Sequence, residues 1–183
     1  MNRKIGILRG INVGGKRKIL MADLKSLCEE LGLKNVTTYI QSGNVIFTSE
    51  TANSEKLAQT ISQQIEKEFG FDVPVIVRTE KELESSISKN PFIAKDADIY
   101  QLHLTFLKEK PNEEDIERIL TFNYEPDKFK IAEKDIFIFC AGKYHESKLT
   151  NSFFEKQLEV GATTRNWKTV MKLSELSKNY NNE

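Results

Sequence analysis

The sequence predicts an α+β fold built from two similar halves, each with an antiparallel sheet. Short β-rich runs alternate with stretches in which apolar residues recur at helical spacing. Glycine and proline separate most of these segments. The same rhythm of segments occurs twice along the 183 residues, a length that suits one large domain or two small ones.

The first half contains four β-rich runs and two amphipathic helical stretches. The strands are predicted at residues 4–9, 35–40, 44–48 and 73–78, and the helices at residues 20–32 and 57–70. Leu20 is the first residue of the first apolar stripe. Gly32 and Gly70 end the helices, because glycine readily adopts the left-handed conformation found there. Pro74 gives the fourth strand an edge or first-residue position.

Turn residues between the second and third strands predict a hairpin. The resulting β-α-β-β-α-β order within about eighty residues is typical of the split βαβ, or ferredoxin-like, plan, also called the alpha-beta plait. In this plan two helices cover one face of a four-stranded antiparallel sheet. We therefore predict a ferredoxin-like domain over residues 1–79.

Residues 80–97 are predicted to connect the two halves. Thr79 and Glu82 fit a capping box, S/T-x-x-E, and a short helix with Leu83 and Ile87 on one side follows. Pro91 cannot continue that helix. The segment is not rich in glycine or serine, so we expect a packed connection and not a flexible linker.

Residues 98–183 repeat the rhythm as a second ferredoxin-like domain with a C-terminal helix. Strands are predicted at residues 99–107, 129–132 and 136–140, and helices at residues 111–120 and 152–158 and along Trp167, Val170, Met171 and Ser174. Gly161 is expected to close the helix before it, and Asn166 is a candidate N-cap of the last helix. No final strand is predicted in this half. The likeness between the halves lies in their pattern of elements and not in their residues.

The composition argues against several classes of function. Lysine plus arginine and aspartate plus glutamate each number 27, so the formal net charge is zero, whereas general nucleic-acid and membrane-surface binders usually carry a basic bias. No apolar run approaches the ~18 residues of a membrane-spanning helix, and no secretory leader is visible. Cys28 and Cys140 lie in apolar patterns and are expected to be reduced thiols. These features predict a cytoplasmic protein with no membrane partner.

Residues 8–18, LRGINVGGKRK, form the strongest candidate for a ligand site. They combine three glycines with four cations and no acid, namely Gly10, Gly14, Gly15, Arg9, Lys16, Arg17 and Lys18. Glycines let the backbone approach a ligand closely, and successive N–H groups can form a concave nest for an anion. Arginine binds phosphate or carboxylate through two hydrogen bonds. We expect an anion here, and a solvated strand-to-helix connection is the alternative.

The spacing of Gly10, Gly15 and Lys16 nearly matches the phosphate-binding P-loop, G-x-x-x-x-G-K-[ST]. The match fails at Arg17, where the motif needs a serine or threonine to bind magnesium. The helical pattern also begins several residues after Lys16, so this lysine cannot open the helix. We interpret the stretch as an anion site and not as a site of NTP hydrolysis.

Residues for other chemistry are scarce. His103 and His145 are the only histidines, and no H-x-x-x-H or C-x-x-C motif groups ligands for zinc. His103 is expected to face solvent or a polar partner. There is no G-x-S-x-G nucleophile motif and no G-x-G-x-x-G dinucleotide fingerprint. The sequence therefore predicts no metal and no cofactor, while enzymatic action on a phosphorylated substrate stays open because no general base can be named.

Four blocks stand out together: LRGIN at residues 8–12 with Gly14 and Gly15, YIQSGN at 39–44, NPF at 90–92 and TTRNW at 163–167. They resemble the signature blocks of a bacterial domain-of-unknown-function family, numbered 1697. The resemblance covers nearly the whole chain. It implies an α+β fold with ferredoxin-like halves and no established activity.

These blocks suggest further ligand-binding residues. Gln41 and Asn44 either form the hairpin turn, since asparagine and serine bond their own backbone there, or face a ligand beside Arg9 and Asn12. Arg165 either is solvated or paired next to a helix cap, or brings a second cation to the glycine-rich stretch. The predicted ligand-binding residues are Arg9, Asn12, Gly14, Gly15, Lys16, Gln41, Asn44 and Arg165.

Three functions fit this sequence, and binding of a small anionic or phosphorylated ligand is favoured. An RNA- or single-strand-binding module is the second, because ferredoxin-like sheets stack bases on aromatic residues of their central strands. The first strand has no aromatic residue and the hairpin offers only Phe47, so this reading is not favoured. The third is a protein-interaction scaffold, with a homodimer as a possible assembly if a sheet face is exposed.

Overall fold

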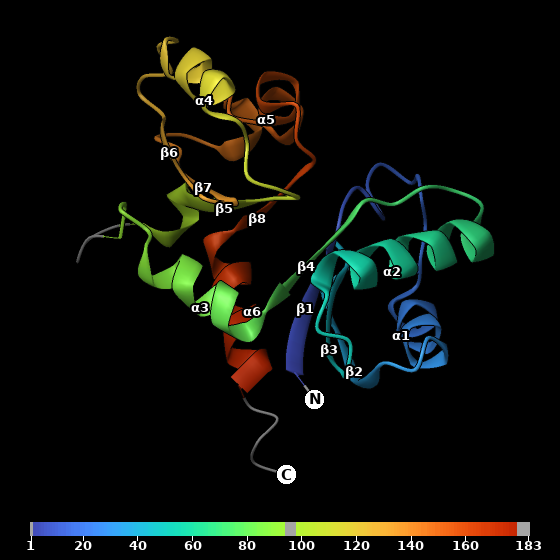
Figure 1. The fold of residues 1–183 in the computed structure, drawn as a ribbon. Coiled ribbons are helices and arrows are strands. Elements are labelled where there is room, and N and C mark those ends of the chain that lie inside the picture. The colour runs from blue at the N-terminus through green and yellow to red at the C-terminus, as the bar shows by residue number, and fades with distance from the viewer. Residues whose placement is uncertain (1, 94–97, 179–183) are drawn as a thin grey trace. The chain divides into compact units, whose positions relative to one another are not determined.

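The computed structural model describes residues 2–93 and 98–178 (Figure 1). The chain divides into two compact units, Met1–Ser85 with Lys172–Glu183, and Ser86–Met171. Each unit contains one four-stranded antiparallel sheet. The domain boundaries given above for residues 1–79, 80–97 and 98–183 stay a prediction. No helix in the described part of the chain is long and apolar enough to cross a membrane.

The first unit has the β-α-β-β-α-β order that its sequence predicts. Its elements are β1 (Asn2–Leu8), α1 (Met21–Glu30), β2 (Lys34–Tyr39), β3 (Asn44–Ser49), α2 (Ser54–Phe69) and β4 (Val75–Thr79). The strand order is β2-β3-β1-β4, and neighbouring strands are antiparallel. Helices α1 and α2 lie side by side on one face of this sheet (Figure 1). This is the predicted ferredoxin-like plan, and β4, which follows Pro74, is an edge strand.

An apolar layer between the sheet and the two helices forms the core of the first unit. It includes Leu24, Leu27 and Cys28 of α1, Leu57, Ile61 and Ile65 of α2, and Val45 and Phe47 of β3. Lys4 is buried on the same face of β1 as Leu8. Its Nζ donates to the backbone oxygen of Ala52 at 2.8 Å and to Ser54 Oγ at 3.0 Å. Burial lowers the pKa of this ammonium group, because the charged form loses its water.

The second unit repeats the same order of elements. They are β5 (Leu102–Leu107), α4 (Glu113–Leu120), β6 (Lys128–Ala132), β7 (Asp135–Phe139), α5 (Asn151–Leu158) and β8 (Ala162–Asn166). The strand order is β6-β7-β5-β8, again antiparallel throughout. Helices α4 and α5 pack against each other (Figure 1). Ile119, Ile138, Phe154 and Leu158 are buried in the core of this unit.

Strand β8 is the main element that the sequence analysis missed. Its residues, ATTRN, contain no large apolar side chain, so no period-two pattern marks them as a strand. In the structure they pair with β5 from His103↔Asn166 to Leu107↔Ala162. Long-range pairing with a buried strand therefore supplies a structure that local sequence does not signal, and it completes the second ferredoxin-like sheet.

Three smaller expectations for the second unit are wrong. Strand β5 begins at Leu102 because a short 3-10 helix, Ile99–Gln101, precedes it. Helix α5 ends at Leu158, and its left-handed C-cap is Glu159, with φ 54°, and not Gly161. Helical spacing with Ile116 and Ile119 predicts that Leu120 is buried, but 59% of its surface is exposed.

Side-chain caps open helices α3 (Glu80–Ser88) and α6 (Trp167–Lys178), as predicted. Glu82 Oε2 accepts from the Thr79 backbone N–H at 2.7 Å, and Thr79 Oγ1 accepts from the Glu82 N–H at 3.1 Å. This is a capping box. Asn166 Oδ1 accepts from the Thr169 N–H at 2.8 Å, so a cap satisfies one of the free N–H groups at the start of α6.

The two units also match in the register of their central strands. The last residues of these strands are Leu8 and Leu107, and the N–H of each donates a 2.9 Å hydrogen bond to a backbone oxygen, of Gly43 and Lys134 respectively. Each acceptor lies two residues before a residue that pairs with the central strand, Val45 or Ile136. Three residues before these strand ends, Ile5 and Leu104 each pair with a buried arginine on the neighbouring edge strand, namely Arg78 of β4 and Arg165 of β8. The likeness of the halves therefore extends to hydrogen-bond register, although their residues differ.

His103 in β5 is buried and does not face solvent. Its ring stacks on Tyr144, with the ring centroids 4.3 Å apart and the planes 20° apart. Burial lowers the pKa of the imidazole below its usual 6.5, and a hydrogen bond with the Gln101 backbone acts in the opposite direction. The folded protein therefore favours the neutral imidazole.

We expect the stability of the protein to fall as the pH drops below 6.5, in part through His103. The unfolded chain takes up a proton at this residue before the folded chain does, so folding is opposed by up to about 1.4 kcal/mol per pH unit in that window. His103→Phe keeps the aromatic stack and should flatten the pH dependence of urea unfolding between neutral pH and pH ~5. The matched control is His145→Gln at the exposed histidine. Equal slopes in wild type and His103→Phe would contradict this.

Candidate functional site

The connection between β1 and α1 is longer than the fold requires. It runs from Arg9 to Leu20, twelve residues, and is called the basic loop below. The equivalent connection of the second unit, between β5 and α4, runs from Lys108 to Asn112, five residues. Both connections join the same two elements of a ferredoxin-like sheet. Because loops beyond the structural minimum commonly carry function, the basic loop is the first candidate site.

The side-chain amide of Asn12 holds the basic loop together. Its Nδ2 donates to the backbone oxygens of Ile19 and Gln41, each at 2.9 Å, and its Oδ1 accepts from the Ile19 N–H at 3.0 Å. The Asn12 N–H also donates to Arg17 O at 3.1 Å. Asn12 thus joins both ends of the loop to the β2–β3 turn. The structure gives this predicted ligand residue a role in positioning the loop.

Gly14 and Gly15 form the tip of the loop. The Lys16 N–H donates to Val13 O at 3.1 Å, and the two residues form a β-bridge around the glycines. The glycine φ angles, 58° and 73°, are both positive, as a type I′ turn requires. An anion nest instead alternates right- and left-handed residues. Helix α1 begins only at Met21, so Lys16 does not stand at a helix N-terminus and the loop is not a P-loop.

The β2–β3 turn packs directly on the basic loop through Gly43. A Cβ added at Gly43 would lie 2.6 Å from Ile11 Cδ1 and 2.9 Å from Leu8 Cβ, and its φ is +81°. Asn44 is buried, and its Nδ2 donates to Tyr39 O at 3.0 Å and to Ser42 Oγ at 3.3 Å. These contacts make Asn44 a residue of the turn itself. The backbone oxygen of Gln41 accepts from Asn12, and its side chain is exposed.

The cations of the loop are placed differently from the residues that hold it. Lys16, Arg17 and Lys18 are exposed, and within the described residues none of the three forms an ion pair or a side-chain hydrogen bond. The Arg17 guanidinium passes Gly10, with Nη1 3.5 Å from the position of an added Cβ. Arg9 is half-buried and its N–H donates to Pro74 O at 3.0 Å. The loop therefore presents three unneutralised charges to solvent.

Three exposed aliphatic side chains also lie in the basic loop and the adjoining turn, and the sequence analysis did not identify them. Val13 is 66%, Leu20 67% and Ile40 45% exposed. Leu20 was expected in the buried stripe of the first helix, but it is the N-cap of α1 and lies outside the stripe. Ile40 has φ 51°, an unfavourable conformation for a β-branched residue. Periodicity does not reveal any of the three, because turn geometry places them.

Backbone strain is concentrated at this site. Six non-glycine residues in the described part of the chain have positive φ, and three of them, Asn12, Arg17 and Ile40, lie in the basic loop or the adjoining turn. Such conformations each cost on the order of 1–3 kcal/mol and persist where surrounding contacts enforce them. Their clustering here is consistent with a loop shaped for a purpose other than connecting β1 to α1.

Arg165, the remaining predicted residue, lies in the second unit. It is in β8, buried, and its Nη1 donates to Thr164 O at 3.0 Å. Burial lowers the pKa of its guanidinium to about 10. The sequence analysis placed Arg165 in a loop before a helix, whereas the structure places it within a strand. That it joins the basic loop stays a prediction.

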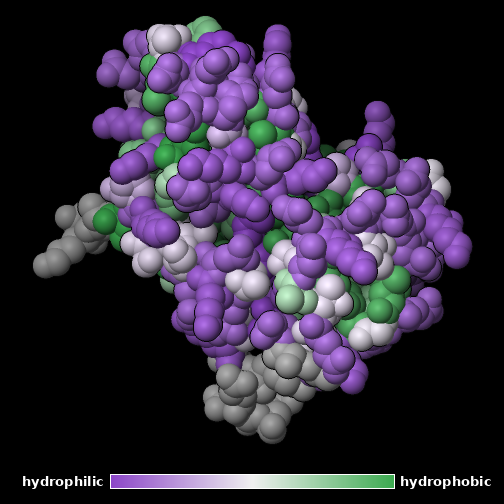
Figure 2. Space-filling model, viewed as in Figure 1, coloured by the Kyte–Doolittle hydropathy of each residue, from purple (hydrophilic) through white to green (hydrophobic). Residues whose placement is uncertain are grey.

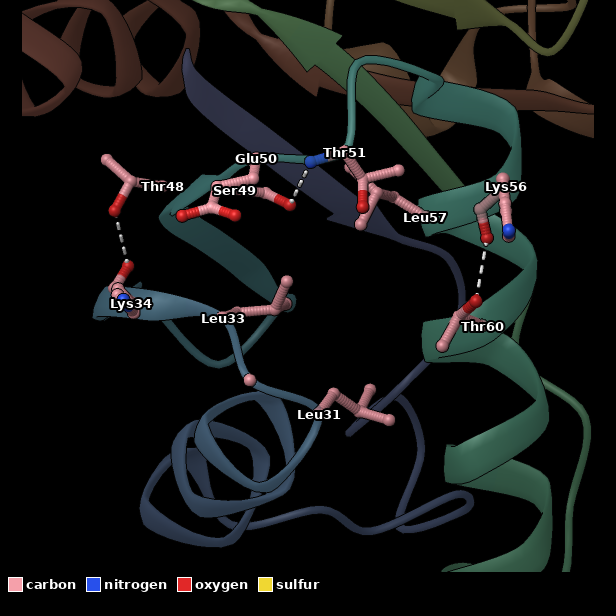
Figure 3. Close-up of a pocket in the computed structure, with 11 residues that line it drawn as sticks. Leu31, Leu33, Lys34, Thr48, Ser49, Glu50, Thr51, Lys56, Leu57 and Thr60 are labelled. Atoms are coloured by element: carbon pink, nitrogen blue, oxygen red, sulfur yellow. Dashed lines mark hydrogen bonds between the residues drawn. The ribbon is translucent and has the colours of Figure 1, made fainter. Parts of the chain in front are cut away.

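Two hollows elsewhere are weaker candidates. One, of about 320 Å³, lies between the start of β2 and the N-terminal end of α2 (Figure 3). Its hydroxyl groups are engaged locally: Thr48 donates to Lys34 O, Ser49 accepts from the Thr51 N–H, and Thr60 donates to Lys56 O. These hydroxyl groups are therefore not free for a ligand, and the charged side chains of the hollow, Lys34, Glu50 and Lys56, are of mixed sign.

The second hollow, of about 420 Å³, belongs to the second unit. Phe92, Tyr124 and Phe129 supply its aromatic lining. Tyr124 OH donates to Ile119 O at 3.0 Å, and Asp127 accepts from the Ala141 N–H at 2.9 Å. Among the residues that the structure describes, no three histidine, cysteine, aspartate or glutamate side chains group as metal ligands. Neither hollow combines free charge with an unusual backbone, as the basic loop does.

We predict that Gly43→Ala destabilises the protein more than Gly32→Ala. Both glycines have φ near 80°, but nothing lies within 4 Å of a Cβ at Gly32. Gly32→Ala should lower the free energy of unfolding by about 1–2 kcal/mol through backbone strain. Gly43→Ala should lower it by about 2–5 kcal/mol, because overpacking against Leu8 and Ile11 is added. Urea unfolding measures both, and equal losses would refute the packing of the turn on the loop.

Asn12→Ala should loosen the basic loop and lower the free energy of unfolding by about 2–3 kcal/mol, because three side-chain hydrogen bonds are lost and φ stays positive. Asn35→Ala is the control, because Asn35 also has positive φ, 54°, but within the described residues its side chain makes one hydrogen bond, to Thr48 Oγ1 at 3.0 Å. Trypsin cleavage after Lys16, Arg17 or Lys18 should accelerate in Asn12→Ala alone. Unchanged cleavage there would show that the amide does not hold the loop.

Comparison with known proteins agrees with this fold. The sequence matches the family model "Protein of unknown function (DUF1697)" over residues 1–137. The structure is similar to that of the conserved bacterial protein SP0830 from Streptococcus pneumoniae, with a TM-score of 0.73 and 23% identity over 97% of this chain and 99% of that one. At that identity the likeness concerns the fold alone. No curated protein matches the sequence. The matched residues include the whole basic loop and the β2–β3 turn, and the chain belongs to the DUF1697 family.

Proposed function

We propose that this protein binds a small anionic or phosphorylated ligand on its basic loop. One observation carries the proposal: the first unit makes a connection in twelve residues that the second makes in five, and the longer one presents Lys16, Arg17 and Lys18 without partners among the described residues. A connection alone needs neither the length nor the charge.

The electrostatics of the loop favour an anion. The chain contains no acidic residue before Asp23, so no local carboxylate neutralises the three cations. Like charges at adjacent positions repel, and a bound phosphate relieves that repulsion. Arg17 can donate two parallel hydrogen bonds to phosphate oxygens, while the lysines act as point charges.

The loop is also held in shape before any ligand arrives. The Asn12 amide bonds both of its ends to the β2–β3 turn, and Gly43 lets that turn sit against Ile11. Preorganisation of this kind lowers the entropy lost on binding. In this proposal Lys16, Arg17 and Lys18 contact the ligand, with Arg9 and Gln41 beside them. Asn12, Gly14 and Gly15 build the loop, and Asn44 belongs to the adjoining turn.

The test is calorimetric titration with inorganic phosphate, pyrophosphate and tripolyphosphate at low salt. Affinity should rise with ligand charge and fall with added salt, because exposed charges are screened. Lys16→Ala/Lys18→Ala and Arg17→Ala should each weaken tripolyphosphate binding by at least about tenfold, or 1.4 kcal/mol. Arg9→Ala tests the half-buried arginine in the same way.

The matched control is Lys128→Ala/Lys130→Ala, which removes two exposed lysines from edge strand β6 of the second unit. Its overall charge equals that of Lys16→Ala/Lys18→Ala. If both double variants lose affinity equally, binding follows net charge and not the loop, and the proposal fails. It also fails if wild type binds none of the three phosphates.

A further inference from the structure

The basic loop has an apolar component that a small phosphate would leave uncovered. Val13, Leu20 and Ile40 are each next in sequence to one of the residues that the Asn12 amide brings together, namely Asn12 itself, Ile19 and Gln41. Their backbones therefore lie near one point. The basic apolar patch is defined here as Val13, Lys16, Arg17, Lys18, Leu20 and Ile40. Exposed aliphatic side chains gathered in this way are typical of a macromolecular contact.

Helix α4 of the second unit carries the complementary surface. Glu113, Glu117 and Leu120 are exposed at i, i+4 and i+7 spacing, which places them on one side of the helix, and Glu114 is exposed beside them. Phe122, just after the helix, is 52% exposed. The acidic apolar face is defined here as Glu113, Glu114, Glu117, Leu120 and Phe122.

The glutamates of this face are not neutralised locally. Within the described residues no ion pair or side-chain hydrogen bond involves Glu113, Glu114 or Glu117. The nearby cation Arg118 is occupied instead: its Nη2 lies 2.6 Å from Asp115 Oδ1, and it also donates to Gln157 O. The buried side of α4 is formed by Asp115 and Ile119. Three free acids with two apolar side chains thus match three free cations with three apolar side chains.

We propose that the basic apolar patch of one copy docks on the acidic apolar face of α4 of a second copy. Charge complementarity steers such a contact, and burial of the aliphatic side chains stabilises it. Each copy carries both surfaces, so a reciprocal pair of contacts closes a twofold dimer, whereas a single contact repeated from copy to copy gives an open chain. This inference goes beyond anion binding and does not depend on it.

The association is weak and depends on salt. Figure 2 shows that hydrophilic residues dominate the visible face and that hydrophobic ones form small separate areas on it. The two proposed surfaces contain few residues, which is typical of contacts below the size of stable interfaces. We expect a dissociation constant in about the micromolar range or weaker, and dissociation at high ionic strength.

The test is sedimentation velocity of the full chain at two concentrations about a hundredfold apart, at low and high salt. Wild type should sediment faster at the higher concentration and at low salt only. The loop-reversed variant, Lys16→Glu/Arg17→Glu/Lys18→Glu, and the helix-reversed variant, Glu113→Lys/Glu114→Lys/Glu117→Lys, should each be monomeric. An equimolar mixture of the two should associate again, because each reversed surface then meets its opposite.

Two controls separate charge from fold and from anion binding. Lys128→Glu/Lys130→Glu changes charge on β6 and should associate like wild type, and circular dichroism checks that every variant is folded. Leu20→Gln should weaken association with no change in charge. The helix-reversed variant should still bind tripolyphosphate, so loss of association with retained phosphate binding separates the two proposals.

A wild type that stays monomeric at both concentrations overturns this inference, whatever the phosphate titration shows. So does a mixture of the two charge-reversed variants that fails to associate. Association that survives both reversals would place the interface elsewhere on the chain and also refute it.

Discussion

The central strand β1, hydrogen-bonded on both sides, is the constraint from which the first unit is built. Its pairing with β3 and β4 fixes the position of Leu8, the last residue of the strand, and therefore the point at which the chain leaves the sheet. At that edge the Leu8 N–H reaches Gly43 and the Arg9 N–H reaches Pro74. The β2–β3 turn and the start of β4 are thereby brought against the first residues of the basic loop. A change in strand register would move this whole edge, since one residue of slip exchanges the two faces of a strand.

Within this frame, neutral and charged residues have separate tasks. The Asn12 amide, the Gly14–Gly15 turn and Gly43 determine the path of the loop through hydrogen bonds and close packing. Such contacts between uncharged groups are little affected by salt. The side chains of Lys16, Arg17 and Lys18 form no ion pair or hydrogen bond within the described residues, which leaves their charge available. A loop held by its own ion pairs would have to break them before it could bind an anion.

The two units use the same frame for different surfaces. Both end their central strands with equivalent backbone hydrogen bonds and place a buried arginine at the same register. They differ between the first strand and the first helix, where one unit carries a long basic loop and the other a short connection followed by the acidic start of α4. A formal net charge of zero therefore conceals oppositely charged surfaces. Net charge is a weak guide to binding when charge is segregated in this way.

Two buried polar groups show how the same strand position is handled in each core. In β1 the ammonium group of Lys4 is surrounded by the acceptors Ala52 O and Ser54 Oγ. In β5 the imidazole of His103 stacks on Tyr144, and burial lowers its pKa. A buried charge needs hydrogen-bond partners in place of water, whereas a neutral ring can be packed as an aromatic. The pattern of the sequence marks neither position as buried, because lysine is rarely and histidine only sometimes found in a protein core.

The sequence by itself determined the fold class, nearly every helix and strand, and the caps at Thr79 and Asn166, because these follow from periodicity and from interactions a few residues apart. It also located the glycine-rich basic stretch. Only the tertiary structure decided that residues 162–166 form a strand, since their hydrogen-bond partners lie far away in β5. The structure also distinguished Asn12 and Asn44, which shape the loop and the adjoining turn, from the cations that the loop presents. It further showed that Leu20 and Ile40 are exposed. Side-chain orientation in turns depends on contacts between distant segments, and local sequence patterns carry no information about such contacts.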